Sequence, residues 1–190
     1  WVALLLAVSA LVVVQFWFLV HIWYWVDHAP QSTAFMNARL ERLREKNSRA
    51  TLQHRWVPYS RISANLKRAV LAAEDAKFLD HEGFDWEGIQ KALEKNQKKG
   101  KVVAGGSTIS QQLSKNLLLS PTKTFLRKGE EAIITVWIEL LWDKRRILEV
   151  YLNVVEWGDG VFGAEAAARR YFNASAAQLG AEQAARLAVM

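Results

Sequence analysis

At 190 residues, the chain is long enough for one ordinary domain plus an anchor, and its lack of cysteine excludes disulfides and cysteine-ligated metal sites. Its 25 Lys and Arg residues outnumber its 19 Asp and Glu residues, and the net charge of +6 favours anionic lipid or phosphate partners. Nucleic acid is the competing partner, but the sequence has no zinc-ligand spacing and no RNP-like aromatic motif, so we expect no nucleic-acid binding.

Residues 1–26 contain no Asp, Glu, Lys or Arg, and the first formal charge is Asp27. A helix of this length would measure roughly 39 Å, which exceeds a hydrocarbon core of about 30 Å. An aromatic belt follows in its later half, at Trp17, Trp23, Tyr24 and Trp25. A cleaved signal peptide is the alternative, but the apolar run is too long and lacks a small-residue cleavage site. We therefore predict a transmembrane helix over residues 1–26, whose orientation the charge pattern does not set.

Both ends of the chain indicate that it is part of a longer protein. It begins with Trp1 instead of Met, so we expect a missing N-terminal piece. At the other end, residues 181–190 have a helical pattern without a glycine or proline stop, so we expect the C-terminus to be cut.

Residues 27–55 are polar and basic, and we interpret them as a juxtamembrane connector. Five of its basic residues lie within a short helical stretch: Arg39, Arg42, Arg44, Lys46 and Arg49. A helix lying on lipid headgroups and an ordinary solvated helix explain this pattern equally well. The folded domain is then expected over residues 56–190.

From Ser60 onward the periodicity is helical, and almost no segment alternates like a strand, so we predict an all-α domain. Ser63 is expected to cap a first helix, which runs to Ala73 and has Leu66, Val70 and Ala73 on one side.

Further helices follow in chain order. Asp85 is expected to cap a helix that ends at Gly100, with Trp86, Ile89 and Leu93 facing inward. Residues 124–142 form a long apolar helix, which we expect to be buried on several sides. Asp143 opens a helix that runs to Val155, and two alanine-rich helices come last.

The segment 107–119 predicts a helix with one polar and one apolar side. Thr108 and Gln111 fit a capping box at its start, and Pro121 ends it. Ser107, Gln111 and Lys115 form a polar stripe with Thr108 and Gln112 beside it, opposite Ile109, Leu113 and Leu117. The preceding turn, Gly105-Gly106, allows close approach of a ligand, and a helix N-terminus favours an anion. A well-capped surface helix without a ligand is the alternative.

A second polar cluster is Arg127-Lys128-Gly129-Glu130-Glu131 at the start of the long apolar helix. Two cations there oppose the helix dipole unless an anion binds nearby. Arg127, Lys128 and Glu131 have the spacing to face one site, and the first two suit phosphate oxygens. A simple i,i+4 salt bridge explains the spacing as well.

Glu74 is the candidate general base. It follows an alanine-rich helix with Phe78 one turn later, and a carboxylate partly removed from water there would suit proton abstraction near neutral pH. A solvated glutamate is the alternative. His81 is either a second acid–base group or a residue that orders the turn before Gly83.

Five blocks, in order, resemble the peptidoglycan glycosyltransferase family, in particular its monofunctional, membrane-anchored biosynthetic branch. They are EDAKFLDHEG at 74–83, GGSTISQQLSKN at 105–116, RKGEE at 127–131, KRRILEVYLN at 144–153 and GDGVFGAEAAARRYF at 158–172. One small departure from the family's pattern is Ser110, where threonine is frequent in the family, and both residues carry a hydroxyl.

The resemblance implies a lysozyme-like, two-lobed α fold and an inverting glycosyl transfer. In that reaction lipid II is polymerised into β-1,4-linked glycan strands of the cell wall, and undecaprenyl pyrophosphate leaves. By resemblance, Glu74 is the general base, and Glu131 is the second carboxylate of the catalytic pair. The implied role of Glu131 is to organise the cationic groups or a metal rather than to donate a proton. The implied substrate-binding residues are Ser107, Thr108, Gln111, Gln112, Lys115, Asn116, Arg127 and Lys128.

The resemblance also implies the surroundings of the reaction. The enzyme would lie in the bacterial inner membrane as a single-pass protein with its domain on the periplasmic face, and moenomycin would inhibit it. No cofactor is expected to be required, although a divalent cation such as Mg²⁺ could bind at the pyrophosphate, and no protein metal site is predicted. Apolar residues beside the phosphate-facing helix are expected to dip into lipid: Leu117, Leu118, Leu119, Phe125 and Leu126.

Two rival functions use the same residues. A lysozyme-like hydrolase would use Glu74 as an acid, but an uncharged glycosidic bond needs no cluster of cations. A membrane-tethered scaffold without activity is the other rival, although every matching catalytic position is filled.

Overall fold

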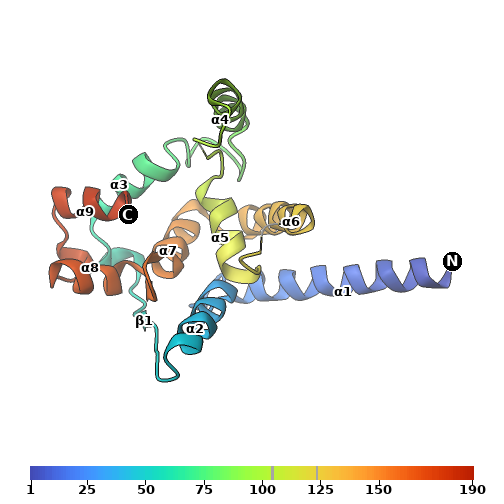
Figure 1. Ribbon diagram of the computed structural model, residues 1–190, viewed down its shortest axis with the longest axis horizontal. Helices are drawn as coiled ribbons and strands as arrows, with labels where there is room; N and C mark the ends of the chain where they lie inside the picture. Colours follow the sequence, from blue (N-terminus) through green and yellow to red (C-terminus); the bar gives the residue numbers. More distant parts are fainter. Residues whose placement is uncertain (104, 123) are drawn as a thin grey trace.

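The computed structural model describes residues 1–103, 105–122 and 124–190 and is mainly helical (Figure 1). The helices are α1 (Val2–Tyr24), α2 (Ala34–Lys46), α3 (Ala64–Glu74), α4 (Trp86–Lys99), α5 (Ile109–Leu118), α6 (Phe125–Leu141), α7 (Lys144–Val154), α8 (Ala164–Phe172) and α9 (Ala181–Ala188). Short 3-10 turns lie at Tyr59–Arg61 and Ala176–Gln178. The predicted helical fold class is therefore confirmed.

A small sheet was missed by the sequence analysis. Strands β1 (Gln53–His54), β2 (Glu156–Gly158) and β3 (Val161–Phe162) pair in the order β1-β3-β2. The β1 strand runs parallel to β3, and β2 runs antiparallel to it. Strands of two or three residues are too short to show an alternating pattern, so only the chain's tertiary pairing defines them.

The α1 helix projects from the domain and is almost entirely exposed (Figure 1). By length and composition it is able to cross a membrane. Its inner end is anchored to the domain, because Ile22 is buried and its carbonyl accepts a hydrogen bond of 2.9 Å from the Trp142 indole. The Arg146 guanidinium also donates to the carbonyl of Trp25.

The connector is packed against the domain. The α2 helix lies against α5, and its Met36 side chain is 2% exposed. Arg39 forms ion pairs with Glu156 at 2.7 Å and with Asp159 at 3.2 Å. Residues 53–54 join the sheet as β1. Contacts with the protein itself therefore hold this basic segment in place.

The predicted helix caps are present. The side chains of Ser63, Asp85 and Asp143 accept hydrogen bonds from the first turns of α3, α4 and α7. Thr108 and Gln111 form the expected capping box at the start of α5. The α4 helix ends at Gly100, whose φ of 62° lies in the left-handed region.

Several predicted inward faces were wrong. On α4, Trp86 and Leu93 are 73% and 57% exposed. The reason is that α4 stands apart from the other helices (Figure 1), so that Ala92 is its buried residue. The α6 helix also buries one side rather than several, since Ile134 and Ile138 are buried while opposite residues are exposed: Ile133, Val136 and Leu140.

The α5 helix lies at the centre of the domain and packs against α2, α6 and α7 (Figure 1). Its apolar stripe, formed by Ile109, Leu113 and Leu117, is at most 2% exposed. Because this stripe is fixed in the core, the N-terminal end of α5 is held in a set position beside α3 and α4.

Gly163, at the start of α8, provides a test of how α8 packs against α7. Its φ is +83°, and an added Cβ would lie 2.6 Å from the Asn153 carbonyl oxygen. We expect Gly163→Ala to lower the free energy of unfolding by about 1–3 kcal/mol from backbone strain alone. Gly129→Ala is the matched control, since no atom lies within 4 Å of the added Cβ. Chemical denaturation of the detergent-solubilised protein measures the free energy of unfolding of each variant. Equal values for the two variants would contradict the positive φ and the close contact at Gly163.

Candidate active site

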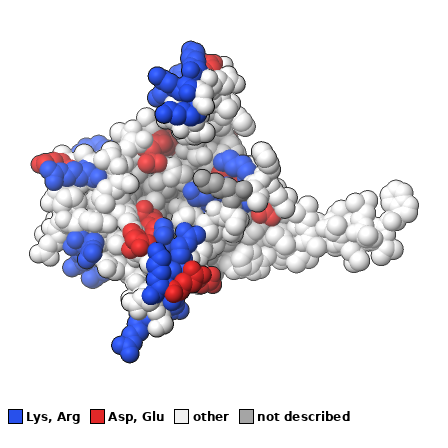
Figure 2. Space-filling model, viewed as in Figure 1, with Lys and Arg blue, Asp and Glu red and all other residues white. Residues whose placement is uncertain are grey.

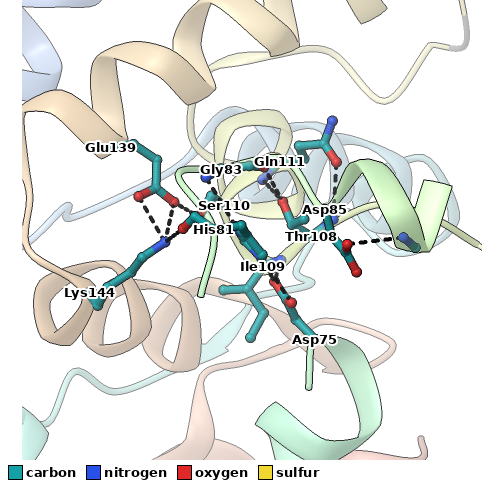
Figure 3. A network of polar contacts seen from close by, with 11 residues as sticks. Asp75, His81, Gly83, Asp85, Thr108, Ile109, Ser110, Gln111, Glu139 and Lys144 are labelled. Carbon is teal, nitrogen blue, oxygen red and sulfur yellow. Dashed lines mark hydrogen bonds and ion pairs between the residues drawn. The ribbon is translucent and has the colours of Figure 1, made fainter. Parts of the chain in front are cut away.

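The buried carboxylate of Asp75 connects α3 to α5 (Figure 3). It accepts hydrogen bonds from the His81 Nε2 atom at 3.0 Å and from the Ile109 backbone N–H at 3.0 Å. The Thr108 hydroxyl donates to the Gly83 carbonyl at 2.7 Å. The end of α3, the loop after it and the start of α5 therefore form one unit.

His81 orders the turn that follows α3. Its Nδ1 atom accepts from the Gly83 backbone N–H at 3.1 Å, so its Nε2 atom carries the proton that Asp75 accepts. Both ring nitrogens are thus engaged in structural hydrogen bonds. Of the two interpretations of His81, this geometry supports the residue that orders the turn over the second acid–base group.

The network extends to α6 and α7 (Figure 3). The Lys144 ammonium donates to the His81 carbonyl at 2.5 Å and to the Glu139 carboxylate at 2.9 Å. Ser110 donates to the same carboxylate. The hydroxyl at position 110 therefore has a defined structural partner, which a threonine would also supply.

Glu74 is the last residue of α3, and its side chain is exposed. Of the two interpretations of Glu74, this exposure fits the solvated glutamate, while Phe78 is buried in the core. The Glu74 Oε2 atom accepts a hydrogen bond of 2.7 Å from the Gln112 side-chain amide. Glu74 faces a groove that it shares with Gly105, Gly106 and Ser107.

Tyr151 on α7 forms a hydrogen bond with Gln112, the residue that contacts Glu74. Its hydroxyl donates to the Gln112 Oε1 atom at 3.1 Å. Burial raises the pKa of Tyr151, and the negative charges of Glu74 and Asp75 raise it further. Tyr151 therefore remains a neutral hydrogen-bond donor.

The predicted cations gather at the start of α6. The Arg127 guanidinium lies 2.7 Å from the buried Glu131 carboxylate, and the Lys128 ammonium contacts its other oxygen. A pocket there is lined by Lys115, Arg127 and Lys128 together with Phe35 and Phe125. Among the described residues, the buried Arg127 Nε atom has no hydrogen-bond partner.

Glu74 and these cations line different pockets, which adjoin one another. Gly106 and Ser107 line both the Glu74 pocket and a middle pocket with Gln111. Lys128 lines both the middle pocket and the cationic pocket. Shared lining residues thus link the three pockets from Glu74 to the cations. The surface of the molecule is hollowed below the lysine-rich α4 (Figure 2).

The remaining predicted site residues have different surroundings. Thr108 and Gln111 are buried, and their side chains form the capping box, although Gln111 still lines the middle pocket. Asn116 is 6% exposed, and Gln112 contacts Glu74. Among the described residues, no group of three or more His, Asp or Glu side chains could hold a metal ion.

Sequence reasoning did not assign site roles to Asp75 and Tyr151. A signal for Asp75 was available, since an acidic residue at a helix end with a histidine six positions later can form a closed turn. Tyr151 reaches Gln112 only through tertiary structure.

Comparisons with known proteins agree with the five sequence blocks. A family model described as transglycosylase matches residues 40–190. A biosynthetic peptidoglycan transglycosylase from Dechloromonas aromatica is 66% identical over 194 residues, which cover 100% of this chain and 83% of that protein. Proteins with the same name from an Azoarcus species and from Aromatoleum aromaticum are 63% and 62% identical, covering 99% and 98% of the chain and 81% of each relative.

Asp75→Asn tests the connection between α3 and α5. An asparagine offers one acceptor oxygen to two donors, and its NH₂ group would face a donor, so we expect a loss of about 1–3 kcal/mol in the free energy of unfolding. Asp80→Asn is the control, because Asp80 is exposed. Chemical denaturation of both variants in detergent checks this, and a wild-type midpoint for Asp75→Asn would rule the connection out.

Proposed function

The chain belongs to the transglycosylase family, and we propose on this premise that it polymerises lipid II into the β-1,4-linked glycan strands of peptidoglycan. The observation that carries the proposal is the row of three adjoining pockets: the exposed carboxylate of Glu74 lines the first, and the cations of α5 and α6 line the last. The names of relatives that are 62–66% identical support the same activity.

Glu74 acts as the general base in this proposal. It takes the proton from the 4-hydroxyl of the N-acetylglucosamine of lipid II, and that oxygen attacks the anomeric carbon of the donor glycan. The bond between the anomeric carbon and the pyrophosphate breaks, so undecaprenyl pyrophosphate leaves and the configuration inverts. The exposed position of Glu74 at the edge of the groove gives an acceptor sugar access to its carboxylate.

The cationic pocket receives the pyrophosphate. Lys115, Arg127 and Lys128 line it and offset the negative charge that develops on the leaving group. Glu131 contacts Arg127 and Lys128, so its role is to hold these two cations in place and not to transfer a proton. A Mg²⁺ ion bound by the pyrophosphate would be an additional source of positive charge.

The polyprenyl chain of the donor remains in the membrane. Phe125 and Leu126 at the start of α6 are 99% and 78% exposed, and Phe125 also lines the cationic pocket. Leu117 and Leu119 are buried in the core, so the expectation that they dip into lipid was wrong. We place α1 across the bacterial inner membrane, with the domain on the periplasmic side.

Glu74→Gln tests the catalytic role. The amide cannot accept the proton, so we expect the rate of lipid II polymerisation to fall by about 10²–10⁴-fold while the melting temperature stays close to that of the wild type. Glu82→Gln is the control, since Glu82 is an exposed carboxylate near the same loop. The assay measures polymer length, sensitivity to moenomycin and the number of new reducing ends. Polymerisation by Glu74→Gln at the wild-type rate would refute the role of Glu74 as the base. Release of reducing ends from preformed polymer by the wild-type enzyme would indicate a hydrolase and would refute the proposed function.

The double variant Phe125→Ser, Leu126→Ser tests the lipid contact. We expect a loss of activity on lipid II with its full undecaprenyl chain, because two exposed apolar side chains no longer enter the bilayer. A short-chain lipid II analogue serves as the control substrate and should be polymerised at the wild-type rate. Equal losses on both substrates would show that these residues act elsewhere.

A further inference from the structure

We propose that Tyr151 is a positioning residue for the reaction, because its hydroxyl orients the Gln112 amide that holds the Glu74 carboxylate. This inference rests on the proposed function, in which Glu74 is the base. It assigns to Gln112 a role different from contact with the donor substrate, and it gives Tyr151 a defined part in the active site.

Two consecutive hydrogen bonds connect three helices, and we call this chain of hydrogen bonds the relay. Tyr151 on α7 donates to Gln112 Oε1 at 3.1 Å, and Gln112 Nε2 on α5 donates to Glu74 Oε2 at 2.7 Å at the end of α3. Tyr151 is 3% exposed, whereas Gln112 is half-buried and Glu74 is exposed. The relay therefore runs from the core to the edge of the groove.

Electrostatics set the direction of both hydrogen bonds. If the Gln112 amide were reversed, its oxygen would lie about as close to the Glu74 carboxylate as its nitrogen does now, and the two oxygens would repel each other. Tyr151 keeps its proton, because burial and the nearby carboxylates raise its pKa. A neutral phenol thus supplies the donor that the amide oxygen needs.

The relay has a catalytic consequence. An exposed glutamate at a helix end populates several rotamers, and a base must lie within hydrogen-bond reach of the acceptor hydroxyl. Gln112 engages one carboxylate oxygen, and no described residue hydrogen-bonds to the other. That second oxygen is available to the acceptor hydroxyl in a defined position.

Tyr151→Phe is the experiment that tests this relay. Phenylalanine keeps the buried ring and removes the donor, so Gln112 loses its orientation. We expect kcat for lipid II polymerisation to fall about ten- to a hundredfold, with KM and the melting temperature unchanged, since small misplacements of a catalytic group cost rates of this size. Tyr171→Phe is the matched control, because its hydroxyl donates to the Trp157 carbonyl at 3.1 Å, and we expect wild-type kcat.

A double variant shows whether the two residues act as one unit. Gln112→Asn shortens the side chain so that it cannot span Tyr151 and Glu74, and we expect a similar loss of kcat. Combining it with Tyr151→Phe should cause little further loss, because the relay is already broken.

The outcomes separate this inference from the function on which it rests. Wild-type kcat in Tyr151→Phe, a loss in KM alone, or independent losses that multiply in the double variant would each overturn the relay. If Glu74→Gln is inactive while Tyr151→Phe is fully active, the proposed function stands and the relay falls. If Glu74→Gln is active, the assigned base is wrong and the relay has no catalytic role.

Discussion

The hydrogen bonds of the Asp75 carboxylate are the constraint on which the candidate site depends. A buried carboxylate is costly unless its oxygens are satisfied, and here His81 and the backbone N–H of Ile109 both donate to it. These donors come from two segments, so satisfying one charge also fixes the end of α3 against the start of α5. Glu74 and the glycine turn before α5 keep their relative positions for this reason.

The candidate base and the cationic cluster line neighbouring but separate pockets, with Glu74 in one and Lys115, Arg127 and Lys128 in the other. At the α6 end, Arg127 and Lys128 oppose the helix dipole, and the buried Glu131 compensates for them within the protein. A further anion is still favoured there, because Arg127 and Lys128 are two cations that share the one carboxylate of Glu131. At the other end, Glu74 remains exposed and unpaired with any cation of this cluster, as a base requires.

Features that depend on neighbouring residues were predicted correctly from the sequence. The caps at Ser63, Asp85, Thr108 and Asp143 are bonds within one helical turn, so a four-residue pattern contains all the necessary information. The apolar stripe of α5 and the ion pairs of Glu131 follow from helical periodicity in the same way. The ordered motifs identified the family and hence the candidate site residues.

Tertiary structure decided which sides of these helices are covered. The pattern of α4 predicts an inward face for Trp86 and Leu93, but the helix stands apart from the core, and both residues are exposed. Glu74 is exposed, Asp75 beside it is buried, and Tyr151 on α7 reaches Gln112 on the neighbouring α5. A local pattern specifies the direction of a side chain relative to its own helix axis. The position of that axis depends on contacts between residues far apart in the sequence, so burial and the composition of the site appear only in the folded chain.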